Sequence, residues 1–260
     1  MKKQLFCGLL AAAAISLPAK AAWPASVQVD GQVLEGPCHL ESGVTYAPLR
    51  QFLDVVGGWD LRWDSGRKAA VATSGSETLI ADPVADTVTL NGTAYSGGVY
   101  VLEGRTYVPL RLMAELLGGR AAWDPYFGGA AVTSASAGYD AGELYWLSRI
   151  NSAESRGEPI EGQIAVGNVV LNRVESEDFP NTIQDVIFDC VDAIQFEPVG
   201  NGTVYNDPAA QSVEAAMRVL DGEETLEGAM FFYAPALSPG TWINENRTYL
   251  TTIGCHRFYL

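Results

Sequence analysis

A single carboxylate, Glu154, stands where the sequence predicts a corner between two helices. It lies in the segment Ser-Ala-Glu-Ser-Arg-Gly-Glu-Pro, near the end of one predicted helix that Gly157 and Pro159 terminate. The helix that follows is dense in apolar residues and is expected to be buried. A carboxylic acid beside buried apolar surface has a raised pKa and can transfer a proton. The segment from Arg149 to Val174 therefore predicts a general acid at Glu154.

Two further acids follow closely and are given other roles. Gly157 and Pro159 flank Glu158, so helical spacing relative to Glu154 cannot be assumed. We interpret Glu158 as a turn or hydrogen-bonding residue near the substrate rather than a second catalytic acid. Glu161 is expected to be solvated in the first turn of its helix. On spacing alone, an ordinary acid at a helix end is the favoured interpretation of Glu154.

Metal and nucleophile chemistry is poorly supported. A zinc site needs several His, Cys or Asp ligands, but the chain has only two histidines, His39 and His256, in different predicted domains. A cysteine nucleophile would need Cys190 beside His256, because the neighbours Cys255 and His256 point to opposite faces of a strand. No Gly-x-Ser-x-Gly segment is present. We expect neither a metal nor a cofactor.

Residues 140–260 are expected to form the domain that positions Glu154. Asp140 and Glu143 have the spacing of a capping box, which predicts a helix running to Ala153. The next helix is predicted from about Glu161 to Val174. Gly167 within it indicates close approach of another element. The polar side chains of Asn168 and Asn172 need partners there, because the helix is otherwise apolar.

The remainder of this domain is predicted to mix short helices with terminal strands. Helices are expected over 183–188 and from Asp207, as a cap followed by Pro208, to Gly222. Strands are expected over 230–233 and within 249–259. Cys190 and Cys255 could form a disulfide or remain free thiols, which would leave Cys38 unpaired.

The first half of the chain contains an internal duplication over residues 27–134. Thr-Tyr-Ala-Pro-Leu-Arg at 45–50 recurs as Thr-Tyr-Val-Pro-Leu-Arg at 106–111, and Gly-Gly at 57–58 recurs at 118–119. Each copy predicts a hairpin at Asp-Gly or Asn-Gly, a helix opened by proline and ended by Gly-Gly, a strand carrying Trp-Asp, and a further strand. Two copies predict a mostly antiparallel sheet packed with two helices. Residues 135–139, rich in small side chains, are predicted to link the domains.

The first 21 residues have the features of a secretory signal peptide. Lys2 and Lys3 precede an apolar run from Leu5 to Leu17, and Ala19-Lys20-Ala21 is a typical cleavage site. The run is short for a membrane helix, and no later segment is long and apolar enough for one. We therefore expect cleavage after Ala21, export, and no membrane span in the mature chain.

The net charge of the chain limits the kinds of molecule that are expected as binding partners. The formal net charge is −15, and removing the signal peptide takes away three lysines and no acid, which gives −18. Nucleic acids and anionic membrane surfaces attract basic proteins, so neither is expected as a partner. The acidic balance is typical of a protein kept soluble outside the cell.

Both halves resemble known families. The doubled Tyr-x-Pro-Leu-Arg and Gly-Gly…Trp-Asp pattern over 27–134 resembles the copper amine oxidase N-terminal-like stalk domain. Residues 144–260 resemble the SleB-type cell-wall hydrolase family, the catalytic domain of spore-cortex-lytic enzymes. The segments that match this family are Ala-Glu-Ser-Arg-Gly-Glu-Pro at 153–159, Val-Val-Leu-Asn-Arg-Val at 169–174, Phe-Phe-Tyr-Ala-Pro at 231–235 and Ile-Gly-Cys-His-Arg-Phe at 253–258.

The resemblances carry expectations about fold and site. They imply an α+β protein, with a duplicated β-rich sheet-and-helix stalk followed by a lysozyme-like, mainly helical domain that has a small β region. The first Glu of the family motif, Glu154 here, is implied as the catalytic acid. Glu158, Gln195, Tyr233 and His256 are candidates for contact with the sugar. With His39 as its only histidine, the stalk is not expected to bind copper. Trp63 and Trp123 could stack on sugars, but core or sheet packing is the favoured role.

The implied function is cleavage of the peptidoglycan glycan strand, in spore cortex or vegetative wall, by a secreted or envelope enzyme. A lytic transglycosylase cutting the MurNAc–GlcNAc bond needs only one acid, whereas hydrolysis needs a second carboxylate. Two alternatives stay open: an N-acetylmuramoyl-L-alanine amidase or peptidase acting on the stem peptide, and a non-catalytic wall-binding protein. The stalk is expected to act as a spacer or to hold a protein or wall partner.

Overall fold

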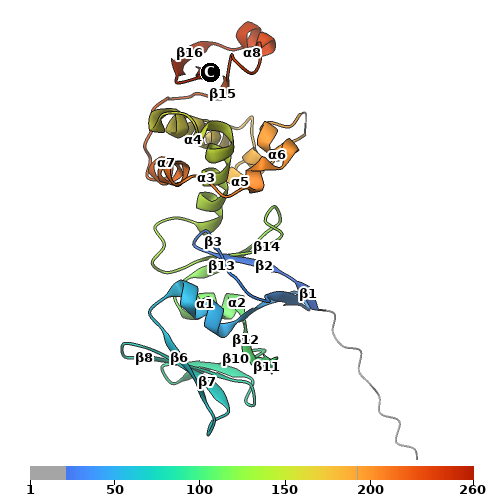
Figure 1. The fold of residues 1–260 in the computed structure, drawn as a ribbon, viewed down its shortest axis with the longest axis vertical. Helices are drawn as coiled ribbons and strands as arrows, with labels where there is room; N and C mark the ends of the chain where they lie inside the picture. Colours follow the sequence, from blue (N-terminus) through green and yellow to red (C-terminus); the bar gives the residue numbers. More distant parts are fainter. Residues whose placement is uncertain (1–21, 192) are drawn as a thin grey trace, which may run out of the picture.

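The computed structural model describes residues 22–191 and 193–260, which form an elongated molecule with a sheet-rich lower half and a helical upper half (Figure 1). The α+β fold class is thereby confirmed, with a duplicated N-terminal part and a C-terminal part that is mainly helical with a small sheet. The signal peptide predicted over residues 1–21 lies outside the described residues.

The sheet-rich half repeats one order of elements. After β1 (Ala22–Pro24), the first copy contains β2 (Ser26–Val29), β3 (Gln32–Val33), β4 (His39–Glu41), β5 (Val44–Pro48), α1 (Leu49–Val56), β6 (Asp60–Asp64) and β7 (Ala69–Ser74). After β8 (Glu77–Asp82), the second contains β9 (Thr87–Leu90), β10 (Thr93–Ser96), β11 (Tyr100–Leu102), β12 (Arg105–Pro109), α2 (Leu110–Leu116), β13 (Arg120–Asp124) and β14 (Gly129–Thr133).

The local signals of the repeat are confirmed. Asp30-Gly31 joins β2 to β3 and Asn91-Gly92 joins β9 to β10, and all four residues have positive φ, as a tight hairpin turn with matching twist requires. The helices α1 and α2 begin directly after Pro48 and Pro109. Proline suits these positions because it lacks the N–H that a helix start leaves unpaired.

The strands form three sheets rather than the single sheet that we predicted. Their orders are β1-β4-β5-β12-β11, β10-β9-β8-β7-β6 and β13-β14-β2-β3. Strands β5 and β12 pair with Ala47 opposite Val108, two residues 61 positions apart, so a local two-fold axis relates the copies. The prediction was wrong because the pattern defines each strand but not its partner. Each of the three sheets combines strands of both copies.

The core of this half forms between the sheets and the two helices. Phe52 and Leu53 of α1 and Leu110 and Met113 of α2 are fully buried in it. The core role predicted for the two tryptophans is wrong, because the residues Trp63 and Trp123 are 48% and 49% exposed. A hollow, rather than a packed helix, faces each ring.

The helical half surrounds a long central helix. Its helices are α3 (Ala141–Ser155), α4 (Ile160–Glu175), α5 (Ile183–Ile187), α6 (Glu197–Asn201), a 3-10 turn (Thr203–Tyr205), α7 (Ala210–Leu220) and α8 (Thr241–Asn246). A small sheet of β15 (Phe231–Tyr233), β16 (Tyr249–Ile253) and β17 (His256–Tyr259), in the order β15-β17-β16, closes the end of the molecule. No helix in the described part of the chain is long and apolar enough to cross a membrane.

The close approach predicted at Gly167 is confirmed, and the element that approaches it is α7. A Cβ on Gly167 of α4 would lie 2.9 Å from Val219 Cγ2 of α7, so only glycine allows this approach. Asn168 donates to the carbonyl of Glu223 at 2.8 Å and accepts from the amide of Thr225 at 2.9 Å. Asn172 donates to Ala229 O at 3.0 Å. Both asparagines thus tie α4 to the loop that follows α7.

The start of α7 differs from the prediction. Asp207 does not cap it, because the helix begins only at Ala210 and its cap position, Ala209, offers no side-chain bond. The Asp207 carboxylate is instead paired with the buried guanidinium of Arg149 at 3.0 Å. The amide of Ala209 donates to Ser152 Oγ. Asp207 thus makes a contact with α3 in place of the predicted cap.

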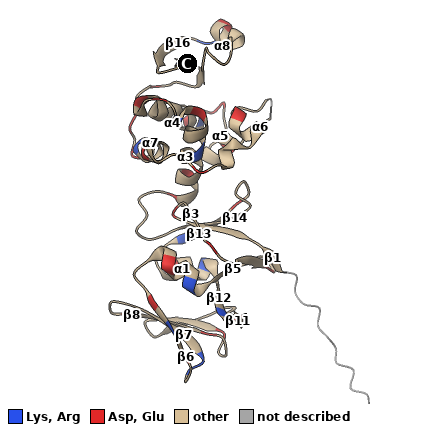
Figure 2. Cartoon of the chain, viewed as in Figure 1, with Lys and Arg blue, Asp and Glu red and all other residues tan. Residues whose placement is uncertain are grey.

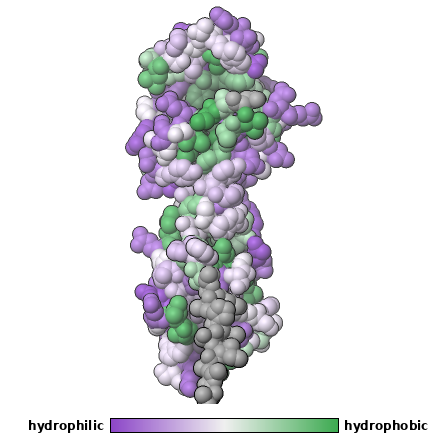
Figure 3. Space-filling view, turned by 90° about the vertical axis from the view of Figure 1, so that its right-hand side faces the viewer, coloured by the Kyte–Doolittle hydropathy of each residue, from purple (hydrophilic) through white to green (hydrophobic). Residues whose placement is uncertain are grey.

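Side chains from both halves meet at the waist between them, which is visible in Figure 3. The buried Asp124 carboxylate accepts from Trp146 Nε1 at 2.6 Å, and the ring of Tyr126 stacks on Phe188 at 4.1 Å between centroids. The segment 134–139 is itself held in place, because the amide of Ser134 donates to Asp30. The two halves are therefore coupled by packed and hydrogen-bonded contacts as well as by the chain.

Candidate active site

A pocket of about 370 Å³ opens between the helices and the terminal sheet. Its size falls within the range of small-molecule sites. The last turns of α3 and α4 form its floor, α6 forms one wall, and β15 with the loop after it forms the other. It is lined by Ala153, Glu154, Arg173, Gln195, Glu197, Pro198, Asn201, Thr203, Phe232, Tyr233, Ala234, Leu237, Ser238 and His256.

Glu154 lies in the last turn of α3, with its half-buried side chain in the pocket. Burial raises the pKa of this carboxyl from the usual 4.5 to about 7. The negative charge of Glu197 raises this pKa further, and the positive charge of Arg173 opposes the rise. The group therefore holds its proton close to neutral pH, as a general acid must.

Arg173 lies beneath the pocket as a buried cation. Its Nε donates to Met230 O at 2.8 Å, and its guanidinium lies over the rings of Phe179 and Phe196, at 4.9 and 5.2 Å from their centroids. Burial lowers its pKa to about 10, so the charge remains at neutral pH. Its Nη1 is buried and has no hydrogen-bond partner among the described residues. A fixed positive charge therefore lies beneath the pocket.

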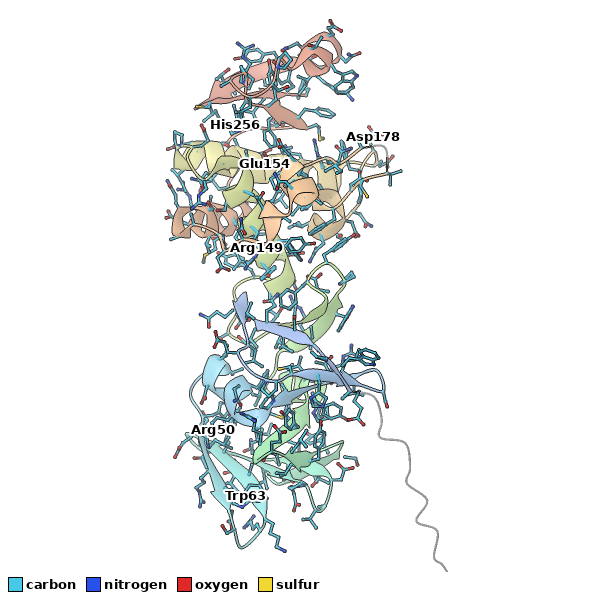
Figure 4. All side chains as sticks on the ribbon, turned by 45° about the vertical axis from the view of Figure 1, so that its right-hand side comes forward. Arg50, Trp63, Arg149, Glu154, Asp178 and His256 are labelled. Carbon is cyan, nitrogen blue, oxygen red and sulfur yellow. The ribbon has the colours of Figure 1, made fainter. Side chains whose placement is uncertain are left out.

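His256, Tyr233 and Gln195 all line the pocket, as the sequence predicted for residues near the substrate. His256 begins β17 and lies above Glu154 in Figure 4. Its ring meets Phe232 edge-on at 5.4 Å, and burial lowers its pKa, which favours the neutral ring at pH 7. The Tyr233 hydroxyl accepts from Asn244 Nδ2 at 2.9 Å, which fixes the phenol at the rim.

Glu158 does not line the pocket, contrary to its predicted place near the substrate. Its Oε2 accepts from the backbone amide of Cys255 at 2.7 Å. The chain turns away after α3, so this carboxylate faces the turn between β16 and β17, where Gly254 leaves room for it. The prediction of a hydrogen-bonding residue is confirmed, but the bond joins the helical corner to the sheet.

Sequence reasoning missed Arg173 and Glu197. Arg173 was noticed only as part of a matching segment, although an arginine inside an apolar helix is a sign of a special role. Glu197 is the first residue of α6, which follows the loop after α5. It affects the pKa of Glu154 only because the chain folds back there. No local pattern indicates that approach.

Within the described residues, no cluster of three or more His, Cys, Asp or Glu could hold a metal ion. Cys38, Cys190 and Cys255 are all free thiols, so the disulfide that the sequence left open is not formed. The pocket is lined by no cysteine, and Cys190 does not join His256 there. What the pocket brings together is one protonated acid, one exposed carboxylate, one buried cation and hydrogen-bonding side chains.

Comparison with known proteins shows the family to which the chain belongs. Residues 157–259 match the family described as Cell Wall Hydrolase, and residues 28–129 match the copper amine oxidase N-terminal domain. The cell wall hydrolase CwlJ of Halalkalibacterium halodurans is 32% identical over 106 residues, which cover 38% of this chain and 73% of that protein. The chain belongs to the cell wall hydrolase family. The family match begins at Gly157, just after Glu154.

Longer relatives share the same region of the chain. The spore cortex-lytic enzymes of Bacillus subtilis and Halalkalibacterium halodurans are each 32% identical to it, over 50% and 48% of the chain. These stretches are 41% and 37% of the two relatives, so the chain spans less than half of their length. A solved catalytic domain of the germination-specific lytic transglycosylase SleB from Bacillus anthracis is 33% identical, covering 47% of this chain and 98% of that one, with a TM-score of 0.43.

Proposed function

We propose that this cell wall hydrolase cleaves the glycan strand of peptidoglycan as a lytic transglycosylase, with Glu154 as its acid. The observation that carries the proposal is the pKa of about 7 of Glu154 within a pocket of sugar-binding size. An acid of this pKa can donate a proton at neutral pH and then act as a base. The SleB domain, which is described as a lytic transglycosylase, supports the same reaction class.

The reaction needs one carboxyl group in two protonation states. Glu154 donates its proton to the oxygen between MurNAc C1 and GlcNAc, and that C1–O bond breaks. The 6-hydroxyl of the same MurNAc attacks C1, and its proton passes to the Glu154 carboxylate. The products are a 1,6-anhydro-MurNAc end and a free GlcNAc hydroxyl. No water is consumed, and the enzyme regains its proton.

The other pocket residues are given supporting roles. The negative charge of Glu197 helps to keep Glu154 protonated near neutral pH. The partly exposed amide of Gln195 can hold acyl or hydroxyl oxygens of the substrate, and the buried charge of Arg173 acts on the site through space. His256 and Tyr233 shape the opposite wall. We infer that these residues contact or orient the sugar, whereas Glu158 supports the fold.

The proposed setting is the cell envelope. The predicted signal peptide and the acidic composition support export, and the spore cortex-lytic names of the relatives support spore cortex as a substrate. Vegetative peptidoglycan has the same glycan bond and is the second candidate substrate. We expect no cofactor and no nucleic-acid partner.

One observation favours a second reaction in the same pocket. Glu197 gives the site a second carboxylate close enough to affect the pKa of Glu154. Glycoside hydrolysis usually requires two carboxylates, and water attacks C1 in place of the 6-hydroxyl. If Glu197 had this role, Glu197→Gln would abolish cleavage, whereas in the transglycosylase it would only change the pH dependence.

Product analysis tests the proposal. Purified cortex and vegetative peptidoglycan are digested with the mature chain, with Glu154→Gln and with Glu197→Gln, and the fragments are identified by mass spectrometry. We expect 1,6-anhydro-MurNAc ends from the mature chain and from Glu197→Gln, and none from Glu154→Gln. New reducing ends would support hydrolysis, free amines from the stem would support an amidase, and the absence of any product would leave a binding protein.

A further inference from the structure

The sheet-rich half contains two hollows built in the same way. The first, of about 230 Å³, lies between the start of α1, the strand β6 with Trp63, and the turn from β11 to β12. The second, of about 370 Å³, lies between the start of α2, the strand β13 with Trp123, and the turn from β4 to β5. Each hollow therefore takes its helix and tryptophan from one copy of the repeat and its turn from the other.

The two hollows are related by the local two-fold axis between β5 and β12. The equivalent positions are occupied by Leu49 and Leu110, Arg50 and Arg111, Trp63 and Trp123, Ala70 and Ala130, and Thr106 and Thr45. In both, the residue paired across the strands with the tryptophan is an alanine, which is too small to cover the indole. The duplication has thus produced two similar sites, each with a tryptophan that is about half exposed, at 48% and 49%.

Folding does not explain why both copies of the repeat have a tryptophan at this position. The aspartate that follows each one does have a structural role, because Asp64 accepts from the amides of Gly66 and Arg67, and Asp124 caps the equivalent turn. Neither indole belongs to the core cluster of this half. A large apolar ring kept exposed at both positions indicates a ligand with an apolar face.

The positive charges around the two hollows indicate a second feature of that ligand. In an acidic chain with a net charge of −15, Arg50, Arg62 and Arg105 all line the first hollow, and Arg111 lines the second. All four are exposed at their hollow. Figure 2 shows basic segments beside α1, β6 and β11, and Figure 4 shows Arg50 and Trp63 in the lower half. Guanidinium groups of this kind recognise carboxylates.

We propose that these two hollows are saccharide-binding sites, each stacking a pyranose ring on its tryptophan and holding a carboxylate of the same polymer with its arginine. The occupant is the N-acetylated, carboxylate-bearing strand of peptidoglycan, a choice that rests on the proposed function. The duplicated half is then a bivalent wall-binding module. Two linked sites on one polymer bind far more tightly than either alone, because the second binding step is intramolecular.

Binding to insoluble wall tests the proposal. The full mature chain carrying Glu154→Gln, which leaves the wall intact, is sedimented with purified peptidoglycan stripped of proteins and phosphate polymers. We expect Trp63→Ala or Trp123→Ala to weaken binding about threefold or more, and the double variant about tenfold or more. Trp63→Tyr with Trp123→Tyr, which keeps aromatic faces, should retain most of the binding. Amidating the wall carboxylates should weaken binding of the chain that carries only Glu154→Gln. It should also lessen the loss of binding caused by Arg111→Gln.

The matched control is Trp23→Ala, because Trp23 is 67% exposed in the same half and lines neither hollow. Unchanged binding of both alanine variants, or an equal loss in Trp23→Ala, would overturn the inference. Thermal melting of each variant shows that a loss is not caused by unfolding. Anhydro products from the chain with Glu154 intact report on the catalytic proposal separately, so the two proposals can fail independently.

Discussion

Glu154 combines partial burial with an open side facing the pocket, and this combination sets its chemistry. Full exposure would leave the carboxyl ionised at neutral pH, whereas full burial would keep it from the substrate. The surrounding charges act in opposite directions, because Glu197 favours the protonated form and Arg173 the ionised form. At the scale of single residues, the site thus contains an acid whose pKa lies close to neutral pH.

The raised pKa of Glu154 has a cost in stability. With a pKa of about 7 in the native state and 4.5 as its usual value, the native state binds the proton more tightly. Both states are protonated at pH 4, and the penalty grows as the pH rises from about 4.5 to 7. We expect Glu154→Gln to leave the free energy of unfolding nearly unchanged at pH 4 and to raise it by up to about 3 kcal/mol at pH 8.

Urea unfolding at pH 4, 6 and 8 measures this effect, with Glu161→Gln as the control, since Glu161 is exposed in the first turn of α4. The stabilisation should appear only in Glu154→Gln and only as the pH rises. An equal change at all three values would show that Glu154 has an ordinary pKa.

Glu197→Gln should move the pH profile of cleavage. Removing its negative charge lowers the pKa of Glu154, so less of the acid is protonated at neutral pH. We expect the alkaline limb of the rate profile to move to lower pH, with a several-fold loss of rate at pH 8 and little change at pH 5. A uniform loss across the profile would mean that Glu197 takes part in the chemistry directly.

The candidate acid could be predicted from the sequence, but its surroundings could not. Glu154 belongs to a continuous motif, and its local features indicate a helix end beside a buried helix. Glu197 and Arg173 influence it through tertiary contacts that bring three separate segments together. Glu158 shows the reverse error, since proximity in sequence placed it near the substrate, whereas its carboxylate bonds to Cys255.

At the scale of elements, the close approach of α4 and α7 supports the floor of the pocket. We expect Gly167→Ala to destabilise the protein by about 1–3 kcal/mol, because the new methyl group would lie 2.9 Å from Val219 Cγ2. Gly157→Ala is the matched control, since a Cβ there meets nothing within 4 Å and should change stability by less than about 0.5 kcal/mol.

Thermal and urea unfolding of both variants measure the difference. Equal stability of the Gly167 and Gly157 variants would mean that α4 and α7 are not in the close contact described. A lower stability of Gly167→Ala should be accompanied by a loss of activity, because Arg173 and the Glu154 corner belong to the same packed unit.

The elements themselves were more predictable than their arrangement. Hairpins at Asp30-Gly31 and Asn91-Gly92, and helices after Pro48 and Pro109, follow from local backbone preferences. The three sheets, with strands exchanged between copies, depend on long-range pairing that each copy's pattern leaves open. For the same reason, the exposure of the repeated tryptophans could not be inferred from their aromatic character.

At the scale of the whole molecule, the two halves meet through Asp124, which has an equivalent in the other copy. Asp124 and Asp64 each cap a turn, but only Asp124 also accepts from Trp146 of α3. We expect Asp124→Ala to cost about 1–3 kcal/mol more than Asp64→Ala, because it leaves the buried indole N–H unpaired. Calorimetry should show that the helical half of the Asp124 variant melts at a lower temperature.

An Asp124→Ala variant that melts at the temperature of Asp64→Ala would show that the bond from Trp146 to Asp124 does not stabilise the contact between the halves. The coupling matters for the proposed function, because a wall-binding half fixed to the catalytic half limits which glycan bonds reach Glu154. An elongated molecule with binding sites in one half and the acid in the other would cut at a set distance from its point of attachment (Figure 1).

The most direct measurement of the central claim is digestion of peptidoglycan in water enriched in oxygen-18, with mass spectrometry of the new glycan ends. If Glu154 alone supplies proton transfer and the 6-hydroxyl attacks C1, every new MurNAc end is an anhydro sugar, one water lighter than a reducing end and free of the label. Glu154→Gln should form no new ends. Reducing ends that carry oxygen-18 would show that water is the nucleophile and would contradict the transglycosylase account.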